Sequence, residues 1–268
     1  MTTFIKFGGS VITDKRTPEA PDLPIIHAMA HAIATVLQTA TTARLVLSHG
    51  SGSYGHVAAA RYGIHKGLAA DADWTGYAVT SGAASRLNRI VVDALLAAGV
   101  PALTLQPSAT CETQDGSVVA WDTQHLEKAL THRLIPVIHG DVAFDRRQGC
   151  SIASTEMLLQ WLTTIPTLVP NRIILVGESA VYTADPHTNP DAVRIPMVTH
   201  TTIDAVLGGA TGSHGVDVTG GMASKLRLMW SLIERNPHLD VVFIRPDPTL
   251  LIRAILRQEL SEGTVMQW

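Results

Sequence analysis

Four short segments of the sequence combine glycine with a side chain that can bind or neutralise a phosphate. They are KFGGS (residues 6–10), HGSGSYGH (49–56), HGD (139–141) and DVTGGMASK (217–225). Glycine lets backbone N–H groups approach an anion closely, and the amino terminus of a helix adds a favourable dipole. One such segment would be weak support for a ligand site, because many glycines only form turns. Several of them, each with a lysine, histidine or aspartate, predict a site that holds many phosphate oxygens.

The positive charge for such a site comes from lysines outside the common nucleotide-binding motifs. The sequence has no GxxxxGK(S/T) motif and no GxGxxG followed by the acidic residue of a Rossmann unit. The candidate cations are Lys6, Lys15 and Lys225. A buried ammonium group needs an anionic partner, so a lysine among glycines is hard to explain by structure alone. Lys15 has the simpler alternative of a solvated surface side chain.

Short apolar runs alternate with helical stretches along the chain. The candidate strands are FIKF, RLVLSHG, PALTLQ, LIPVIHGD, NRIILVG and VVFIRP, and SVVAW within residues 111–121 predicts a hairpin insertion. Residues 23–43 and 74–98 have helical spacing. Strands separated by helices predict βαβ units and a mostly parallel sheet, in one compact domain with two lobes. Ligands gather at the carboxyl ends of such strands, which is where three of the glycine segments fall.

Composition excludes several classes of protein. Hydrophobic residues make up 46% of the chain and charged residues 16%, so a large core is expected. Lys and Arg number 20 against 23 Asp and Glu, for a net charge of −3 without a basic block, so no nucleic-acid partner is expected. Residues 23–43 lack charged side chains but contain His, Gln and Thr among helically spaced apolar residues. This pattern predicts an amphipathic helix and no membrane insertion.

The cysteines, the amino-terminal segment and the histidines favour an ordinary cytoplasmic protein. Cys111 and Cys150 belong to no CxxC motif and are expected to be small buried apolar side chains. The amino terminus lacks the apolar segment of a signal peptide. His27 and His31 lie one helical turn apart but have no evident third ligand, so no metal site made of side chains is expected.

Longer segments around these motifs carry a family resemblance. IKFGGSVITDK, SHGSGSYGHVAAARYGIHKG, IPVIHGDVAFD and DVTGGMASK, between residues 4 and 225, together resemble the isopentenyl phosphate kinases, a branch of the amino acid kinase superfamily. The KxGGS start indicates only the superfamily, whereas Gly55–His56 followed by YGIHKG is specific to the branch. The resemblance implies an α/β fold, a three-layer α/β/α sandwich around a mostly parallel open sheet, formed by residues 1–268 as a single domain. It also implies a homodimer.

The same resemblance implies a reaction and a set of site residues. The reaction is the ATP-dependent phosphorylation of isopentenyl phosphate, with Mg²⁺, in which residues 1–165 bind the acceptor and residues 166–268 bind ATP. The implied ATP-side residues are Lys6, Gly8, Gly9, Ser10, Gly52, Gly220, Gly221 and Lys225. The implied acceptor-side residues are Ser51, Gly55, His56, Gly140 and Ser154. Lys15 would stabilise the transition state and His56 would donate a hydrogen bond to the phosphate that the acceptor already carries.

Three departures from the family pattern leave alternatives open. ASTEM (153–157) stands where the family commonly has SGDD, so Thr155 and Glu156 take its acidic places. VGESAVYT (176–183) lacks two aspartates, and FIRPDPTLL (243–251) replaces the usual glycine-bearing turn. One alternative is a kinase for another phosphate or phosphonate, such as fosfomycin, and another is a ligand-binding domain that has lost catalysis. The segment YGIHKG and the following helix favour an apolar acceptor tail, with Tyr77, Ala78 and Ser81 as candidate pocket residues. Asp141 is expected either to orient a lysine or to form a turn.

Overall fold

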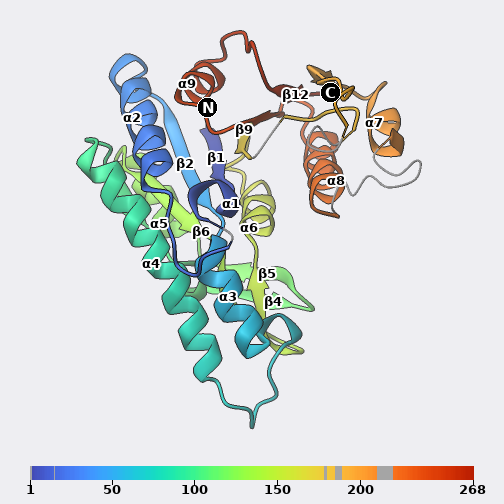
Figure 1. Cartoon of the computed structure of the whole chain (residues 1–268). Helices are drawn as coiled ribbons and strands as arrows, with labels where there is room; N and C mark the ends of the chain where they lie inside the picture. Colours follow the sequence, from blue (N-terminus) through green and yellow to red (C-terminus); the bar gives the residue numbers. More distant parts are fainter. Residues whose placement is uncertain (1, 15, 178–179, 185–188, 210–219) are drawn as a thin grey trace.

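The computed structural model describes residues 2–14, 16–177, 180–184, 189–209 and 220–268. At its centre lies an eight-stranded sheet (Figure 1). In spatial order its strands are β10 (Met197–Val198), β12 (Thr264–Met266), β11 (Asp240–Ile244), β9 (Pro170–Val176), β1 (Thr2–Phe7), β2 (Arg44–His49), β6 (Ile135–His139) and β3 (Ala102–Thr104). Neighbouring strands run parallel except β11 and β12, which are antiparallel. The predicted mostly parallel open sheet is therefore confirmed.

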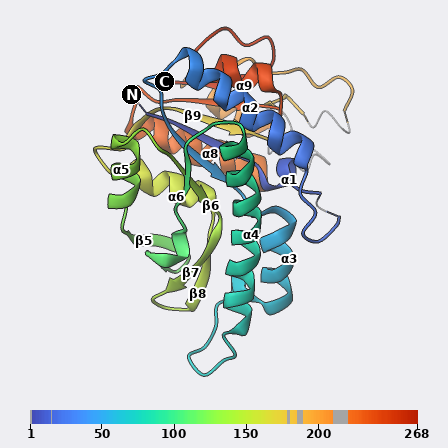
Figure 2. The ribbon, with the colours of Figure 1, turned by 90° about the vertical axis from the view of Figure 1, so that its left-hand side faces the viewer.

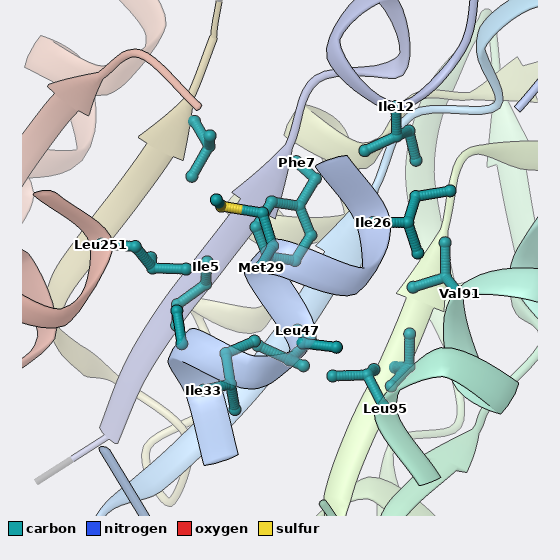
Figure 3. Packing of buried hydrophobic residues seen from close by; sticks show 14 of the residues in the cluster. Ile5, Phe7, Ile12, Ile26, Met29, Ile33, Leu47, Val91, Leu95 and Leu251 are labelled. Carbon is teal, nitrogen blue, oxygen red and sulfur yellow. The ribbon is translucent and has the colours of Figure 1, made fainter. Parts of the chain in front are cut away.

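Helices cover both faces of this sheet and complete three layers. One face carries α2 (Leu23–Thr39), α4 (Thr75–Ala97) and α9 (Pro248–Ile255), and the other carries α5 (Gln124–Thr131), α6 (Thr155–Leu162) and α8 (Gly220–Arg235). Figure 2 looks onto α2 and α4. Successive side chains of a strand point to opposite faces, so Ile5 and Phe7 pack under α2 (Figure 3) while Phe4 joins the other core. The predicted α/β/α sandwich is confirmed.

The uncharged segment after residue 22 forms the amphipathic helix that its spacing predicts. The Asp22 side chain accepts a hydrogen bond from Ile25 N–H (3.1 Å) and caps the first turn of α2. Ile33 on its inner face is fully buried, whereas His27 and His31 are exposed. Among the described helices, none is long and apolar enough to cross a membrane.

A smaller four-stranded sheet extends from the carboxyl end of β6. Its order is β5 (Ser117–Trp121), β4 (Cys111–Gln114), β7 (Asp141–Asp145) and β8 (Gly149–Ala153), and β4 and β5 form the predicted hairpin. The Asp145 carboxylate accepts hydrogen bonds from Gly116 N–H (2.9 Å), Arg147 N–H (2.9 Å) and Gln148 N–H (3.0 Å), which ties two hairpin turns together. Although burial opposes it, this set of donors holds the pKa of Asp145 far below its ordinary value. Cys111 and Cys150 lie in this sheet as free, buried side chains, as predicted.

Four central strands end at the same level and bring their following loops together. Phe7 of β1 pairs in register with His49 of β2 and Val176 of β9, and His49 pairs with His139 of β6. The helices not yet placed are α1 (Gly9–Ile12), which follows β1, α3 (Gly52–Tyr62), which follows β2, and α7 (Ile203–Gly209). The glycine segments after β1, β2 and β6 therefore lie side by side.

Candidate active site

A cavity of about 500 Å³ lies where these strand ends meet. Most of the residues that the sequence predicts for the site line it: Lys6, Gly8, Gly9, Ser10, Ser51, Gly52, His56, Gly140, Ser154 and Lys225. The lining comes from β1, β8, the loops after β2 and β6, and the first two turns of α1, α3, α6 and α8. Segments more than two hundred positions apart in the sequence thus form one site.

Four predicted site residues are not in that lining. Gly55 lies in α3 against the Ser51 side chain, where a Cβ atom would clash with it. Gly220 and Gly221 begin α8, which carries Lys225 at its sixth position. Lys15 lies outside the described residues, and its predicted role stays a prediction.

The glycine loops after β1 and β2 approach one another at backbone distance. A Cβ atom on Gly9 would lie 2.5 Å from Gly52 N and 2.8 Å from Gly52 Cα. A Cβ atom on Gly50 would lie 2.9 Å from Gly9 N. Because neither position has room for a side chain, both segments can present backbone N–H groups to the same ligand.

Lys6 is held by a carboxylate inside the cavity. Its Nζ atom lies 2.5 Å from Glu156 Oε1, and both side chains are largely buried. Burial acts to raise the pKa of Glu156, but the charge and hydrogen bond of Lys6 and the charge of Lys225 hold it below its ordinary value. Glu156 is therefore ionised at neutral pH, paired with Lys6 and within the electrostatic influence of Lys225. The predicted site lacked Glu156, although its acidic place in ASTEM was the signal that could have identified it.

Two helices direct their amino termini at the cavity. Ser51 and Ser154 precede α3 and α6, and the Ser154 hydroxyl oxygen accepts a hydrogen bond from Met157 N–H (3.3 Å). Unpaired N–H groups and the helix dipole make such termini favourable places for anions. Together with Lys6 and Lys225, they give the cavity a strongly anion-attracting end.

Part of the cavity lining is apolar. His56 is exposed in the second turn of α3, and Val57 and Ile152 line the cavity near it. Ile152 packs in a cluster with Trp74 and Tyr77, and the Tyr77 ring stacks on Phe144 with centroids 4.8 Å apart. An anion-binding end next to an apolar flank suits a ligand that has a phosphate head and a hydrocarbon tail.

Two histidines lie beneath the glycine loops and do not reach the cavity. Burial lowers the pKa of His49 to about 3, with a contribution from His139, and burial lowers the pKa of His139 to about 4. Their rings stack with centroids 5.6 Å apart. Asp141 accepts a hydrogen bond from Val142 N–H (2.8 Å) and lies 3.7 Å from His139 Nε2, and burial raises its pKa. Its side chain is thus part of this buried layer and not a partner of Lys6.

Comparison with known proteins agrees with this geometry. The model of the amino acid kinase family matches residues 1–243. The chain belongs to the amino acid kinase family. Among its relatives, the isopentenyl phosphate kinase of Methanothermobacter thermautotrophicus is 33% identical over 263 residues, which cover 96% of each chain. That of Haloferax volcanii is 36% identical over 229 residues, which cover 85% of this chain and 87% of its own. A crystal structure of an isopentenyl phosphate kinase matches all of both chains with a TM-score of 0.82 and 30% identity.

Proposed function

We propose that the protein transfers the γ-phosphoryl group of ATP to isopentenyl phosphate and forms isopentenyl diphosphate. The observation that carries this proposal is the cavity itself, which joins Lys6, Lys225 and two helix amino termini to an apolar flank beside His56. The anion-attracting end suits the phosphates of ATP and acceptor, and the flank suits a short hydrocarbon tail. The curated relatives with the same reaction in their names support this assignment.

The reaction needs positioning and charge neutralisation more than covalent chemistry. An oxygen of the acceptor phosphate forms a bond to the γ-phosphorus of ATP, and the bond from that phosphorus to the ADP oxygen breaks. The attacking oxygen is already ionised, so no general base is required. Lys6 and the backbone N–H groups of Gly9 and Gly52 stabilise charge on the transferring group. Glu156 fixes the Lys6 ammonium at the cavity before the phosphates arrive.

The donor set of the cavity fits a Mg²⁺ ion that is held mainly by ATP. Glu156 is the acidic side chain of the described lining, and its carboxylate already bonds Lys6. Mg²⁺ prefers phosphate oxygens and water over an all-protein cage, so one carboxylate and nearby hydroxyls such as Ser10 are a sufficient protein contribution. The ion supplies further neutralisation of phosphate charge when it is bound.

The aromatic cluster supports a short acceptor tail. None of the three predicted pocket residues is in the lining of the cavity: Tyr77 belongs to the cluster that packs with Ile152, Ala78 is exposed, and the Ser81 hydroxyl lies 3.3 Å from that of Ser108. We therefore assign the pocket wall to Ile152 and its end to Tyr77 and Phe144. Each buried CH₂ contributes ~0.8 kcal/mol, so a closed end discriminates between acceptors of different length.

We also propose a cytoplasmic homodimer whose residues 1–165 bind the acceptor and whose residues 166–268 bind ATP. The free cysteines fit a reducing compartment. The edge strand β3 exposes Leu103, and α4 exposes Leu96, which gives an apolar surface that a second copy could cover. Sedimentation equilibrium should give twice the monomer mass, and a monomer would contradict this part of the proposal.

A substrate panel tests the proposed function. Initial rates with ATP and Mg²⁺ are compared for isopentenyl phosphate, a ten-carbon prenyl phosphate and fosfomycin. The five-carbon acceptor should have the highest kcat/KM, and His56→Ala should lower it while His125→Ala, at an exposed position of α5 outside the cavity, should not. A preference for fosfomycin, or no transfer to any acceptor, would refute the proposal.

A further inference from the structure

A chain of buried side chains connects α4 and β3 to the glycine loop after β2. Thr104 Oγ1 donates a hydrogen bond to Asn88 Oδ1 (2.8 Å), and Asn88 Nδ2 lies 3.0 Å from His49 Nε2. His49 Nδ1 in turn lies 3.0 Å from the carbonyl oxygen of Gly50. Asn88 and His49 are 1% and 0% exposed, so water does not compete for these bonds.

The donors and acceptors of this chain fit together in one way. A carbonyl oxygen only accepts, so His49 Nδ1 must carry the proton that it gives to Gly50. Burial keeps the imidazole neutral, so Nε2 has no proton and must accept from the Asn88 amide nitrogen. The Asn88 oxygen then faces Thr104, whose hydroxyl donates to it. The hydrogen bonds therefore run in one direction, from Thr104 to Gly50.

The last bond of the chain sets the orientation of a peptide unit at the cavity. In a trans peptide the C=O and the following N–H point in opposite directions, so holding the Gly50 carbonyl toward His49 turns Ser51 N–H away from it. Ser51 lines the cavity, and its N–H has no acceptor among the described residues. The His49 carbonyl is fixed as well, by Gly140 N–H (3.0 Å) and the Thr155 hydroxyl (2.9 Å).

We propose that Asn88 is a positioning residue which, through the His49 ring, aims the Ser51 N–H at the phosphate of the acceptor. Asn88 itself touches no substrate. The identity of the acceptor rests on the proposed function, whereas the direction of the hydrogen-bond chain does not. Loss of this chain of hydrogen bonds should weaken acceptor binding without changing the ATP side of the cavity.

Two matched variants separate this role from a merely structural one. Thr104→Val removes the hydroxyl that orients the Asn88 amide, and Thr80→Val removes a buried hydroxyl that bonds only Gly76 O of its own helix (2.8 Å). Thr104→Val should raise KM for isopentenyl phosphate about three- to tenfold with KM for ATP changed less than about twofold, and Asn88→Leu should have a larger effect. Thr80→Val should change neither constant more than about twofold. Equal effects of Thr104→Val and Thr80→Val, or equal changes in both KM values, would overturn the proposal.

The tautomer of His49 gives a test that does not depend on the acceptor. In ¹⁵N-labelled protein, the His49 ring should carry its proton on Nδ1, and Nε2 should show the shift of an unprotonated acceptor. Thr104→Val should leave the proton on Nδ1, because the Gly50 carbonyl still only accepts, but should change the Nε2 shift because the Asn88 amide that donates to Nε2 is held less firmly, and Thr80→Val should leave the spectrum unchanged. A wild-type His49 with its proton on Nε2 would refute the proposed direction of the hydrogen bonds even if the kinase assay succeeds. If isopentenyl phosphate is not a substrate but Nδ1 is protonated, the proposed function fails and the hydrogen-bond chain is retained.

Discussion

Acidification from about pH 7 to about pH 5 tests whether the two buried histidines beneath the glycine loops are held neutral in the folded protein. His49 and His139 are 0% exposed, and their pKa values of about 3 and about 4 lie below the ordinary 6.5. Unfolded histidines take up protons in this range while the folded ones do not, so the unfolded state is stabilised as the pH falls. Each histidine should lower the free energy of unfolding by about 2 kcal/mol between these pH values, and the pair by about 4 kcal/mol.

Urea unfolding followed by fluorescence of the five tryptophans measures this loss. His139→Asn removes one titrating ring and should cut the pH dependence by about half, although it also lowers stability at neutral pH. His125→Asn is the matched control, because His125 is exposed in α5 and should leave the pH dependence unchanged. A loss below about 1 kcal/mol in the wild type would show that the histidines are not held neutral, and the reasoning would be refuted.

Four further substitutions test the proposed roles of residues in the cavity, of Lys15 and of Tyr77. His56→Ala should raise KM for the acceptor by the equivalent of about 1.5–3 kcal/mol with little change in KM for ATP, and equal rises would contradict the assignment. Lys6→Ala should abolish most turnover because the ammonium faces the transferring group, and retained kcat would remove Lys6 from the mechanism. Lys15→Ala should also lower kcat strongly, whereas unchanged turnover would make Lys15 a surface lysine. Tyr77→Ala should shift the kcat/KM ratio toward ten-carbon acceptors, and a constant ratio would place the end of the pocket elsewhere.

The candidate strands and the loops at their ends could be predicted from the sequence, whereas the order of the strands in the sheet was not. Apolar runs such as RLVLSHG are buried on both faces, which is typical of parallel strands. The glycines that follow these runs are typical of loops that bind a ligand through backbone N–H groups. Since parallel strands end at one edge, Lys6, Ser51 and Gly140 had to meet there. Local sequence patterns are therefore sufficient to predict the parts of the site that are formed by backbone groups.

Contacts between distant side chains could not be predicted in the same way. Lys6 and Glu156 are 150 positions apart, and only the tertiary fold, which brings the first turn of α6 to the end of β1, places Lys6 Nζ 2.5 Å from Glu156 Oε1. Asn88 has the sequence context of an ordinary buried helix position, and its bond to His49 depends on where α4 crosses β2. The helical spacing of α4 also left open which side faces the pocket.

The central claim is that this cavity joins a phosphoryl group to an acceptor that is already phosphorylated. ³¹P NMR of a reaction with isopentenyl phosphate, ATP and Mg²⁺ tests it most directly. The account predicts that the monophosphate signal is replaced by two coupled diphosphate signals as ADP accumulates. The Lys6→Ala variant should form neither the diphosphate nor ADP. Hydrolysis of ATP with an unchanged isopentenyl phosphate signal would contradict it.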